Sequence, residues 1–323
     1  MALALEASAY ERSVRHGGAE RTSVLPLCPL CGCRENEEAF VDNGCELRVC
    51  RHCGLFFVRP YPLCANRHSE VISGRLDGID LLNCERRYAG EQLYYQRHFQ
   101  LIDKECHGAQ SFLDVGCGTG RLLELLSART RLRRMGIELN AQAAQFARRV
   151  ANCEIAEVPF EEFRTSAPFD VVSMINVFSH IPSLDGLFAA LRATLAPGGK
   201  AILRTSEMSA DVSRWNQLHW GIPDDLHFLG LNTLAFLCRK YGFEVRRHVR
   251  VPYEEELFLR SRWQQMGRRR LVNFAKRAGI RVPGALAAMK SIYRAALGGR
   301  LFVSFIVLSP NSARRADAPT GKG

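Results

Sequence analysis

A run of residues at 112–120 has the composition expected of a binding site for a charged small molecule. It reads Phe-Leu-Asp-Val-Gly-Cys-Gly-Thr-Gly, an apolar run that leads into a glycine loop and then into a helical pattern. Glycine lets the backbone approach a ligand closely. The free N–H groups at the start of the following helix attract a carboxylate or a phosphate. The residues predicted to contact a cofactor here are Asp114, Gly116, Cys117, Gly118 and Gly120.

An acidic residue, Glu138, ends the next β-rich run, where a carboxylate can accept two hydrogen bonds from ribose hydroxyls. The glycine spacing differs from the dinucleotide fingerprint G-x-G-x-x-G, because Arg121 stands where the last glycine belongs. Asp114 also repels a pyrophosphate, but it suits a cofactor that carries an amino group and a sulfonium. A nicotinamide-dependent dehydrogenase is therefore disfavoured.

Seven of the twelve cysteines crowd into the first fifth of the chain. Two C-x2-C pairs, Cys28 with Cys31 and Cys50 with Cys53, are separated by eighteen residues and are each followed by glycine. This spacing is typical of a tetrahedral zinc site with four thiolate ligands, which leaves no open coordination position. We therefore predict a structural zinc, with glycines that let backbone N–H groups reach the sulfurs. The neighbours predicted not to bind metal are Cys33, Cys45, Cys64 and His52.

Short β-rich runs alternate with helical patterns from Ser111 onward, which predicts a parallel α/β sheet. The run Leu-Phe-Val-Ser-Phe-Ile-Val-Leu-Ser at 301–309 is predicted to be the last strand, reached through a helical insertion. The predicted organisation is a disordered lead-in at 1–23, a zinc-ribbon module at 24–66, a linker and helix at 67–110, a catalytic domain at 111–310 with the insertion at about 254–300, and a disordered tail at 311–323.

Three further segments, 169–172, 176–182 and 195–199, extend the pattern of the glycine loop and Glu138. With them the chain resembles class I S-adenosylmethionine-dependent methyltransferases. From Cys28 to Pro62 it also resembles zinc-ribbon methyltransferases of bacterial polysaccharide and secondary-metabolite pathways. The resemblance covers about residues 26–309 and implies a Rossmann-like fold of seven strands, S-adenosylmethionine as cofactor, and a small-molecule or sugar acceptor.

The resemblance also places Asn176 in the loop that follows the family's fourth strand, among the cofactor-binding residues. The chain departs from many relatives at Ser179, where those relatives have Glu. The acceptor is predicted to be methylated at a hydroxyl, although the residues leave N- and C-methylation open.

Two histidines are the candidates for a general base that removes the acceptor's proton. His180 follows the fourth strand at the sheet edge where open α/β sheets bind ligands, and its alternative role is to shape the cofactor pocket. His227 precedes the helix after the fifth strand. It is expected to face the acceptor, with His219, Trp220 and Phe228 as walls of that pocket.

The net charge of +11 comes from one segment, since residues 257–300 hold eleven Lys or Arg and no acidic residue. This segment is a solvated helical face, a lid over an anionic acceptor such as a nucleotide-linked sugar, or a peripheral contact with an anionic membrane. No long uncharged apolar run is present, and Glu6 and Glu11 lie where a signal peptide would need its apolar centre. A cytoplasmic location is therefore expected.

Two other functions compete with a small-molecule methyltransferase. An RNA methyltransferase would use the zinc module and the basic segment to bind phosphates, but the segment at Asn176 lacks the Asn-Pro-Pro-Tyr pattern of base-amine methylation, and no Pro-Cys nucleophile is present. A non-catalytic zinc-ribbon adaptor with a relic fold is disfavoured by the intact glycine loop and Glu138. The sequence leaves the oligomeric state open.

Overall fold

The computed structural model of the chain describes residues 27–42, 45–59, 81–208, 225–230, 232–252 and 302–311. The expected lead-in, the first part of the linker, the basic insertion and the tail beyond residue 311 lie outside these residues, as do Cys64, His219 and Trp220. Among the described residues, no helix has the length and apolar character needed to cross a membrane.

A seven-stranded sheet forms the centre of the molecule, with the strand order β10-β11-β8-β7-β4-β5-β6. β11 runs antiparallel to both of its neighbours, β10 and β8, and all other pairs in this sheet are parallel. This confirms the predicted fold class, including the final strand. The strands are β4 (Ser111–Val115), β5 (Arg133–Ile137), β6 (Glu154–Ala156), β7 (Phe169–Ile175), β8 (Leu195–Glu207), β10 (Phe243–Pro252) and β11 (Phe302–Pro310).

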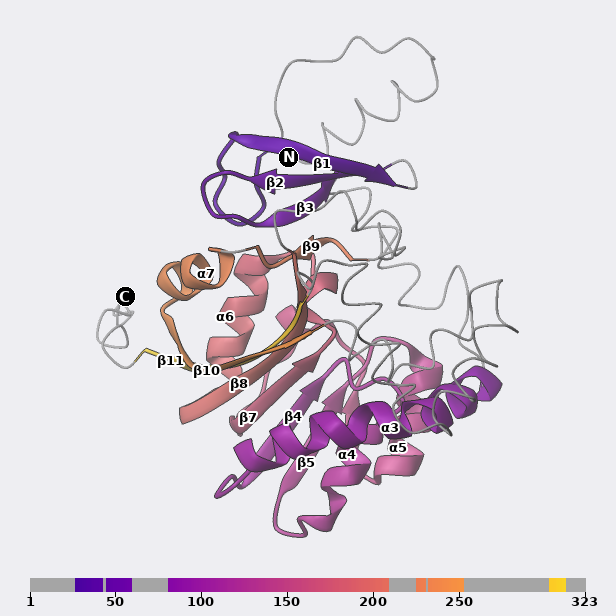
Figure 1. Cartoon of the computed structure of the whole chain (residues 1–323). Coiled ribbons are helices and arrows are strands. Elements are labelled where there is room, and N and C mark those ends of the chain that lie inside the picture. The colour runs from indigo at the N-terminus through magenta and orange to yellow at the C-terminus, as the bar shows by residue number, and fades with distance from the viewer. Residues whose placement is uncertain are drawn as a thin grey trace, which may run out of the picture.

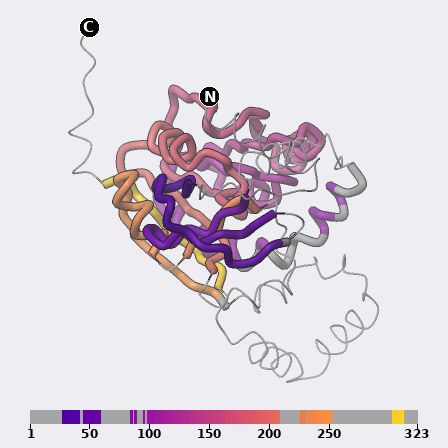
Figure 2. Tube along the Cα trace, turned by 90° about the horizontal axis from the view of Figure 1, so that it is seen from above, coloured from indigo at the N-terminus to yellow at the C-terminus, as the bar shows by residue number. Residues whose placement is uncertain are grey.

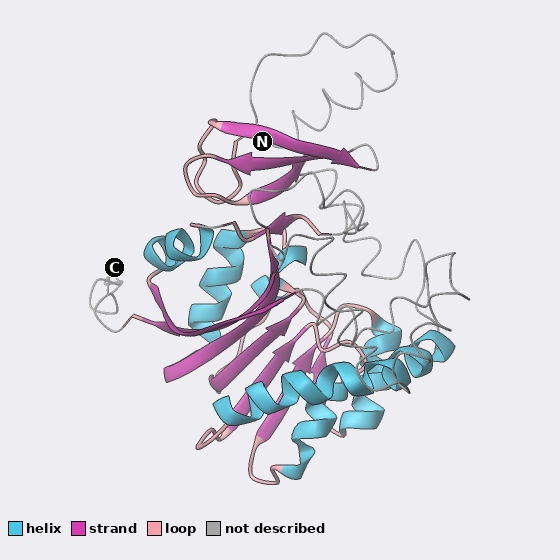
Figure 3. Cartoon of the chain, viewed as in Figure 1, coloured by secondary structure: helices cyan, strands magenta, loops and turns pink. Residues whose placement is uncertain are grey.

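Helices cover both faces of this sheet (Figures 1 and 3). On one face, α3 (Leu81–Glu105), α4 (Arg121–Leu125) and α5 (Ala141–Ala151) pack on side chains such as Phe112 and Val171. On the other face, α6 (Leu184–Thr194) and α7 (Thr233–Tyr241) pack on Leu113 and Val172. The side chains of a strand alternate between the two faces, so each strand supplies both cores. Short 3-10 turns span Leu126–Ala128, Phe160–Glu162 and Phe178–His180.

The chain order creates a crevice at one edge of the sheet. From β4 the chain moves outward through β5 and β6 and then returns to β7 on the other side of β4. The loops that follow β4 and β7 therefore diverge at the carboxyl ends of these strands. Open α/β sheets bind their ligands at such a switch point.

The cysteine-rich module forms a second sheet that also contains a strand from the catalytic domain. β1 (Asn36–Asp42), β2 (Cys45–Cys50) and β3 (Phe56–Arg59) pair in sequence, and β9 (His227–Phe228) pairs antiparallel with β3. Figures 1 and 2 show the module lying over α7 and the carboxyl edge of the main sheet. Lys240 on α7 donates a hydrogen bond to the carbonyl of Leu30 (2.6 Å). The module and the catalytic domain therefore share one packed core, which includes Cys53 and Phe57.

Candidate functional site

The glycine loop between β4 and α4 lies at the switch point, and each of its three glycines has a positive φ (67°, 55° and 77°). A Cβ on Gly116 would lie 2.4 Å from Cγ2 of Val177, and one on Gly120 would lie 2.9 Å from Cα of Ala147. These two glycines are thus required by packing against the β7 loop and against α5. A Cβ on Gly118 would meet only the Arg87 guanidinium, at 3.5 Å. Gly118 is therefore the glycine at which the loop backbone is most open.

Glu138 connects the end of β5 to the glycine loop. Its Oε2 accepts a hydrogen bond from the Gly118 N–H (2.8 Å), and its Oε1 accepts one from the Asn140 N–H (2.9 Å). Asn140 in turn accepts from the Ala143 N–H (2.9 Å) and thereby caps α5. The carboxylate is half-buried at the carboxyl edge, and its remaining lone pairs can accept further hydrogen bonds from hydroxyl groups.

Asp114 lies beneath the loop and is only 2% exposed. The Ser173 hydroxyl on β7 donates to its Oδ1 (2.6 Å). Burial raises the pKa of the Asp114 carboxyl from 3.8 to about 7, against the lowering effect of Ser173, and the nearby Glu138 raises the pKa further. A cation placed beside this carboxyl would favour its ionised form. Asp114 is thus suited to respond to the amino group of a ligand.

Cys117 and Asn176 hold the two loops of the crevice in place. Cys117 is buried, its N–H donates to the Ile137 carbonyl (2.9 Å), and burial raises the pKa of its thiol. Asn176 has φ 60°, a left-handed conformation that asparagine tolerates better than most residues. Its N–H donates to the Arg204 carbonyl on β8 (2.9 Å). Both predicted residues therefore lie at the crevice.

His180 lies in the 3-10 turn after β7, close to two polar groups. Its Nδ1 is 3.6 Å from Oδ1 of Asp225, and its side chain is 28% exposed. The Ser179 hydroxyl donates to the same Asp225 oxygen (2.6 Å). Asp225 therefore places a carboxylate beside Ser179 and His180, in the turn that follows β7. An imidazole that lies near a carboxylate and is partly open to solvent can act as a general base.

The environment of His227 argues against the prediction that it faces the acceptor. Its side chain is fully buried, and its Nε2 lies 2.7 Å from the Phe178 carbonyl oxygen, to which it donates. Burial lowers the pKa of the imidazole to about 3. The ring also packs edge-on against the Phe178 ring. We interpret His227 as a structural residue that ties β9 to the turn after β7.

Three residues near the loop were not singled out from the sequence. Leu139 and Val158 are 39% and 36% exposed, and each lies two residues beyond a paired position of the neighbouring strands β5 and β6, Ile137 and Ala156. They offer apolar surface for a flat ring beside Glu138. Arg87 on α3 brings a guanidinium over Gly118. Of these three residues, only Leu139 could have been predicted from the sequence, because it directly follows Glu138.

The four predicted metal ligands, Cys28, Cys31, Cys50 and Cys53, come together in the cysteine-rich module. Their sulfurs all lie within 4.8 Å of one another. The Sγ atoms of Cys28 and Cys53 are 3.6 Å apart, and those of Cys31 and Cys50 are 3.5 Å apart. Four sulfurs about 2.3 Å from a zinc ion at tetrahedral angles lie about 3.8 Å apart. The arrangement therefore fits zinc with no open coordination position.

Backbone amides surround these sulfurs, as the glycines suggested. The Cys33 N–H donates to Cys31, and the Leu55 N–H donates to Cys53, each two residues beyond the second cysteine of its pair. Gly32 and Gly54 make these turns with φ of 71° and 75°. Donors of this kind stabilise thiolates in a metal site.

Comparison with known proteins gives the family. A family model described as "Methyltransferase domain" matches residues 86–248, just over half of the chain. The chain therefore belongs to the methyltransferase domain family, and with this fold and glycine loop it is an S-adenosylmethionine-dependent methyltransferase.

Individual relatives are distant. The chain is 27% identical over 176 residues to a ubiquinone biosynthesis O-methyltransferase of Nitrosococcus oceani, an alignment that covers 50% of this chain and 72% of that protein. It is 26% identical to 24-methylenesterol C-methyltransferase 2 of Arabidopsis thaliana, over 42% of each chain. Among solved structures, geranyl diphosphate C-methyltransferase from Streptomyces coelicolor A3(2) matches with a TM-score of 0.48 at 16% identity, covering 67% of this chain and 79% of that chain.

Proposed function

We propose that the protein transfers a methyl group from S-adenosylmethionine to a hydroxyl of a small organic acceptor. The observation that carries the proposal is the switch point at the end of β4, where Glu138 accepts from the N–H of Gly118, the glycine with the most open backbone. The exposed side chains of Leu139 and Val158 follow the neighbouring strands β5 and β6. The ubiquinone biosynthesis O-methyltransferase among the relatives supports a hydroxyl, and the sterol C-methyltransferase makes carbon the second candidate.

The residues around the crevice match the parts of the cofactor in polarity. Glu138 would accept from the ribose hydroxyls, and Leu139 and Val158 would contact the adenine ring. Arg87 would pair with the carboxylate of the methionine portion, and Asp114 would balance its amino group. The cofactor would supply an electrophilic methyl on a sulfonium, and the protein's part is to position the acceptor for its transfer.

His180 is the proposed base. Its ring is partly open to solvent and lies near the Asp225 carboxylate, which stabilises the imidazolium that forms when the acceptor hydroxyl loses its proton. His227, the second predicted base, is assigned a structural role because it is fully buried.

Zinc is proposed to be structural. With four sulfur ligands it has no position for an acceptor. Its role is to hold β3 in register with β9 and so to fix the segment 225–228, which carries Asp225. The small-molecule acceptor is proposed to be anionic, such as a nucleotide-linked sugar. The RNA and membrane alternatives depended on the basic segment at 257–300, which lies outside the described residues.

The test is a calorimetric titration of the zinc-loaded protein with S-adenosylmethionine and S-adenosylhomocysteine, with NAD as the control ligand. Wild-type protein is expected to bind both sulfur ligands in the micromolar range and not to bind NAD. Glu138→Ala is expected to weaken binding by about tenfold or more, which corresponds to about 1.4 kcal/mol. Glu154→Ala, a change of an exposed carboxylate on β6, serves as the matched control. Equal affinities for the two variants would contradict the proposed cofactor site.

A further inference from the structure

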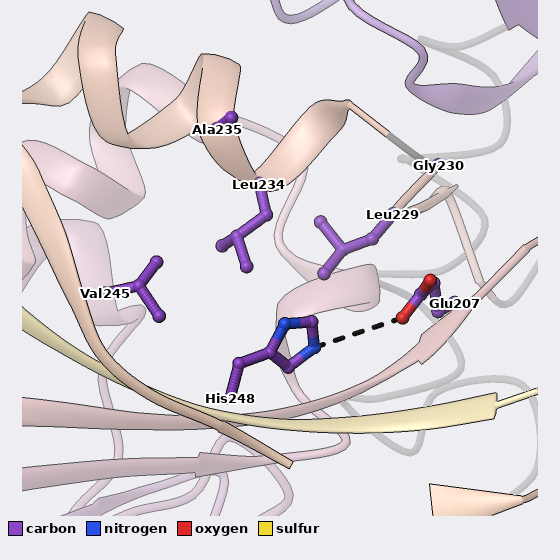
Figure 4. Close-up of a pocket in the computed structure, with 7 residues that line it drawn as sticks. All are labelled: Glu207, Leu229, Gly230, Leu234, Ala235, Val245 and His248. Carbon is purple, nitrogen blue, oxygen red and sulfur yellow. Dashed lines mark ion pairs between the residues drawn. The ribbon is translucent and has the colours of Figure 1, made fainter. Parts of the chain in front are cut away.

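A cavity of about 250 Å³ lies between α7 and the edge of the main sheet, away from the glycine loop (Figure 4). Its walls are apolar and come from Leu229, Leu234, Ala235 and Val245. Its polar end is formed by Glu207 on β8 and His248 on β10. The residues that line it belong neither to the glycine loop nor to the loop that follows β7. The cavity is therefore distinct from the crevice that holds the cofactor loop.

The polar end of the cavity is a hydrogen-bonded chain with a definite direction. The Ser304 hydroxyl, which is fully buried on β11, donates to Oε2 of Glu207 (2.6 Å). Because this donation uses the only hydroxyl proton, the Ser304 oxygen must accept the bond from His248 Nε2 (2.9 Å). The neutral imidazole is therefore protonated at Nε2, and its Nδ1 has a free lone pair. Figure 4 shows this second nitrogen on the side of the ring that faces Leu234 and Leu229.

The charges at this end compensate each other. Arg250 donates to both carboxylate oxygens of Glu207, at 2.6 and 3.1 Å. Burial lowers the pKa of His248, and Arg250 lowers it further, against the raising effect of Glu207. The lowered pKa favours the neutral ring. Because the Glu207 carboxylate is already engaged by Arg250 and Ser304, Nδ1 of His248 is the acceptor that faces the apolar walls. An uncharged ligand suits this site better than an ion, because the Glu207 and Arg250 charges already compensate each other.

The cavity is partly open to solvent, since Val245 in its wall is 41% exposed, and its volume indicates how large a ligand its apolar walls can cover. A dry cavity of about 150 Å³ lined by apolar side chains takes up benzene, and drug-sized ligands occupy about 300 Å³ or more. A volume of about 250 Å³ suits one ring with a substituent.

We propose that this cavity is a second small-molecule site, which binds an uncharged single-ring compound whose one hydroxyl or N–H donor points at Nδ1 of His248. Leu229, Leu234 and Val245 contact the ring. Ser304 and Glu207 are positioning residues that hold the imidazole in the accepting tautomer. The site is independent of the methyl-transfer proposal.

The test uses fluorine NMR on the full-length, zinc-loaded protein with saturating S-adenosylhomocysteine, so that the cofactor site is filled. The probes are 4-fluorophenol and 4-fluorotoluene, which differ in a hydroxyl against a methyl of similar size. Wild-type protein is expected to bind 4-fluorophenol about fivefold more tightly, the effect of one net hydrogen bond. Failure to bind the phenol, or equal affinity for the two probes, would overturn the proposal.

Two variants locate the binding. His248→Phe keeps a ring of similar size but removes both ring nitrogens and with them the acceptor, so the preference for the phenol should disappear; His107→Phe, at an exposed histidine, should preserve it. Leu234→Trp fills the cavity and should abolish binding of both probes. Phe236→Trp enlarges a residue of the same helix that packs on His52 and should leave binding intact. Binding that survives Leu234→Trp would place the probes elsewhere and refute the site.

S-adenosylhomocysteine affinity and zinc content, measured on each variant, establish that the variant is folded. They also distinguish the two proposals. If the wild-type protein did not bind S-adenosylhomocysteine, that result would contradict the methyl-transfer proposal but not the second site.

Discussion

Replacing Asp114 by Asn should change the pH dependence of stability. Asp114 is 2% exposed, and its pKa is raised from 3.8 to about 7 by burial. At about 1.36 kcal/mol for each pKa unit, this rise corresponds to about 4 kcal/mol. Asn has nearly the same shape and still accepts from the Ser173 hydroxyl, but it cannot ionise. The variant therefore removes the cost of a buried charge and little else.

The sign follows from proton binding. Between about pH 4 and pH 7 the folded wild-type protein keeps the Asp114 proton while the unfolded chain has lost it, so its free energy of unfolding falls as pH rises. Integrated with a folded pKa of about 7, the loss between pH 5 and pH 8 is about 3 kcal/mol. Asp114→Asn lacks this loss and should therefore be the more stable protein at pH 8.

The assay is urea unfolding, followed by circular dichroism, of both zinc-loaded proteins from pH 5 to pH 8. The difference in free energy of unfolding between variant and wild type should grow by about 3 kcal/mol over this range. Ser173→Ala removes a donor that lowers the Asp114 pKa. In this variant the free energy of unfolding should therefore keep falling up to a higher pH than in the wild type. A difference that stays constant within about 1 kcal/mol from pH 5 to pH 8 would refute the reasoning.

Further predictions concern packing, metal and catalysis. Gly120→Ala should destabilise the fold by about 2 kcal/mol more than Gly198→Ala in urea unfolding, because the two positions share a φ near 77° but only Gly120 lacks space for a Cβ. Removing zinc with a chelator should lower the melting temperature and abolish turnover, and added zinc should restore both; full activity of the metal-free protein would contradict a structural metal. His180→Asn should reduce kcat by a factor of about 100 or more while leaving cofactor affinity unchanged, as measured by steady-state kinetics and calorimetry. His227→Ala should lower the melting temperature, since the Phe178 carbonyl loses its buried donor; an unchanged melting temperature would count against a structural role.

The sheet and the cofactor loop were predictable from the sequence because their signals are local. Alternating apolar runs specify the strands, and Gly116, Gly118 and Gly120 satisfy backbone requirements within nine residues of Phe112. The cysteine pairs carry the same kind of signal, since zinc requires a fixed ligand spacing. These features were therefore found without knowledge of the tertiary structure.

The role of the histidines could not be predicted in the same way. A His before a helix has the same sequence pattern whether it faces an acceptor or the Phe178 carbonyl, and only the pairing of β9 with β3 buries His227. Arg87 and Asp225 reach the crevice from segments distant in sequence, and nothing in their own neighbourhoods marks them. Burial and long-range contacts decide these assignments.

The pairing of β9 with β3 also has a consequence for biosynthesis. Phe57 leaves the ribosome about 170 residues before its partner His227, which corresponds to a delay on the order of 10–30 s at about 5–20 residues per second. During that interval β3 exposes an unpaired edge, which is a template for pairing with other nascent chains. Early capture of zinc by the four cysteines would compact the nascent module before its last strand arrives. Metal supply during translation should therefore govern the yield of correctly folded protein more than metal supply afterwards.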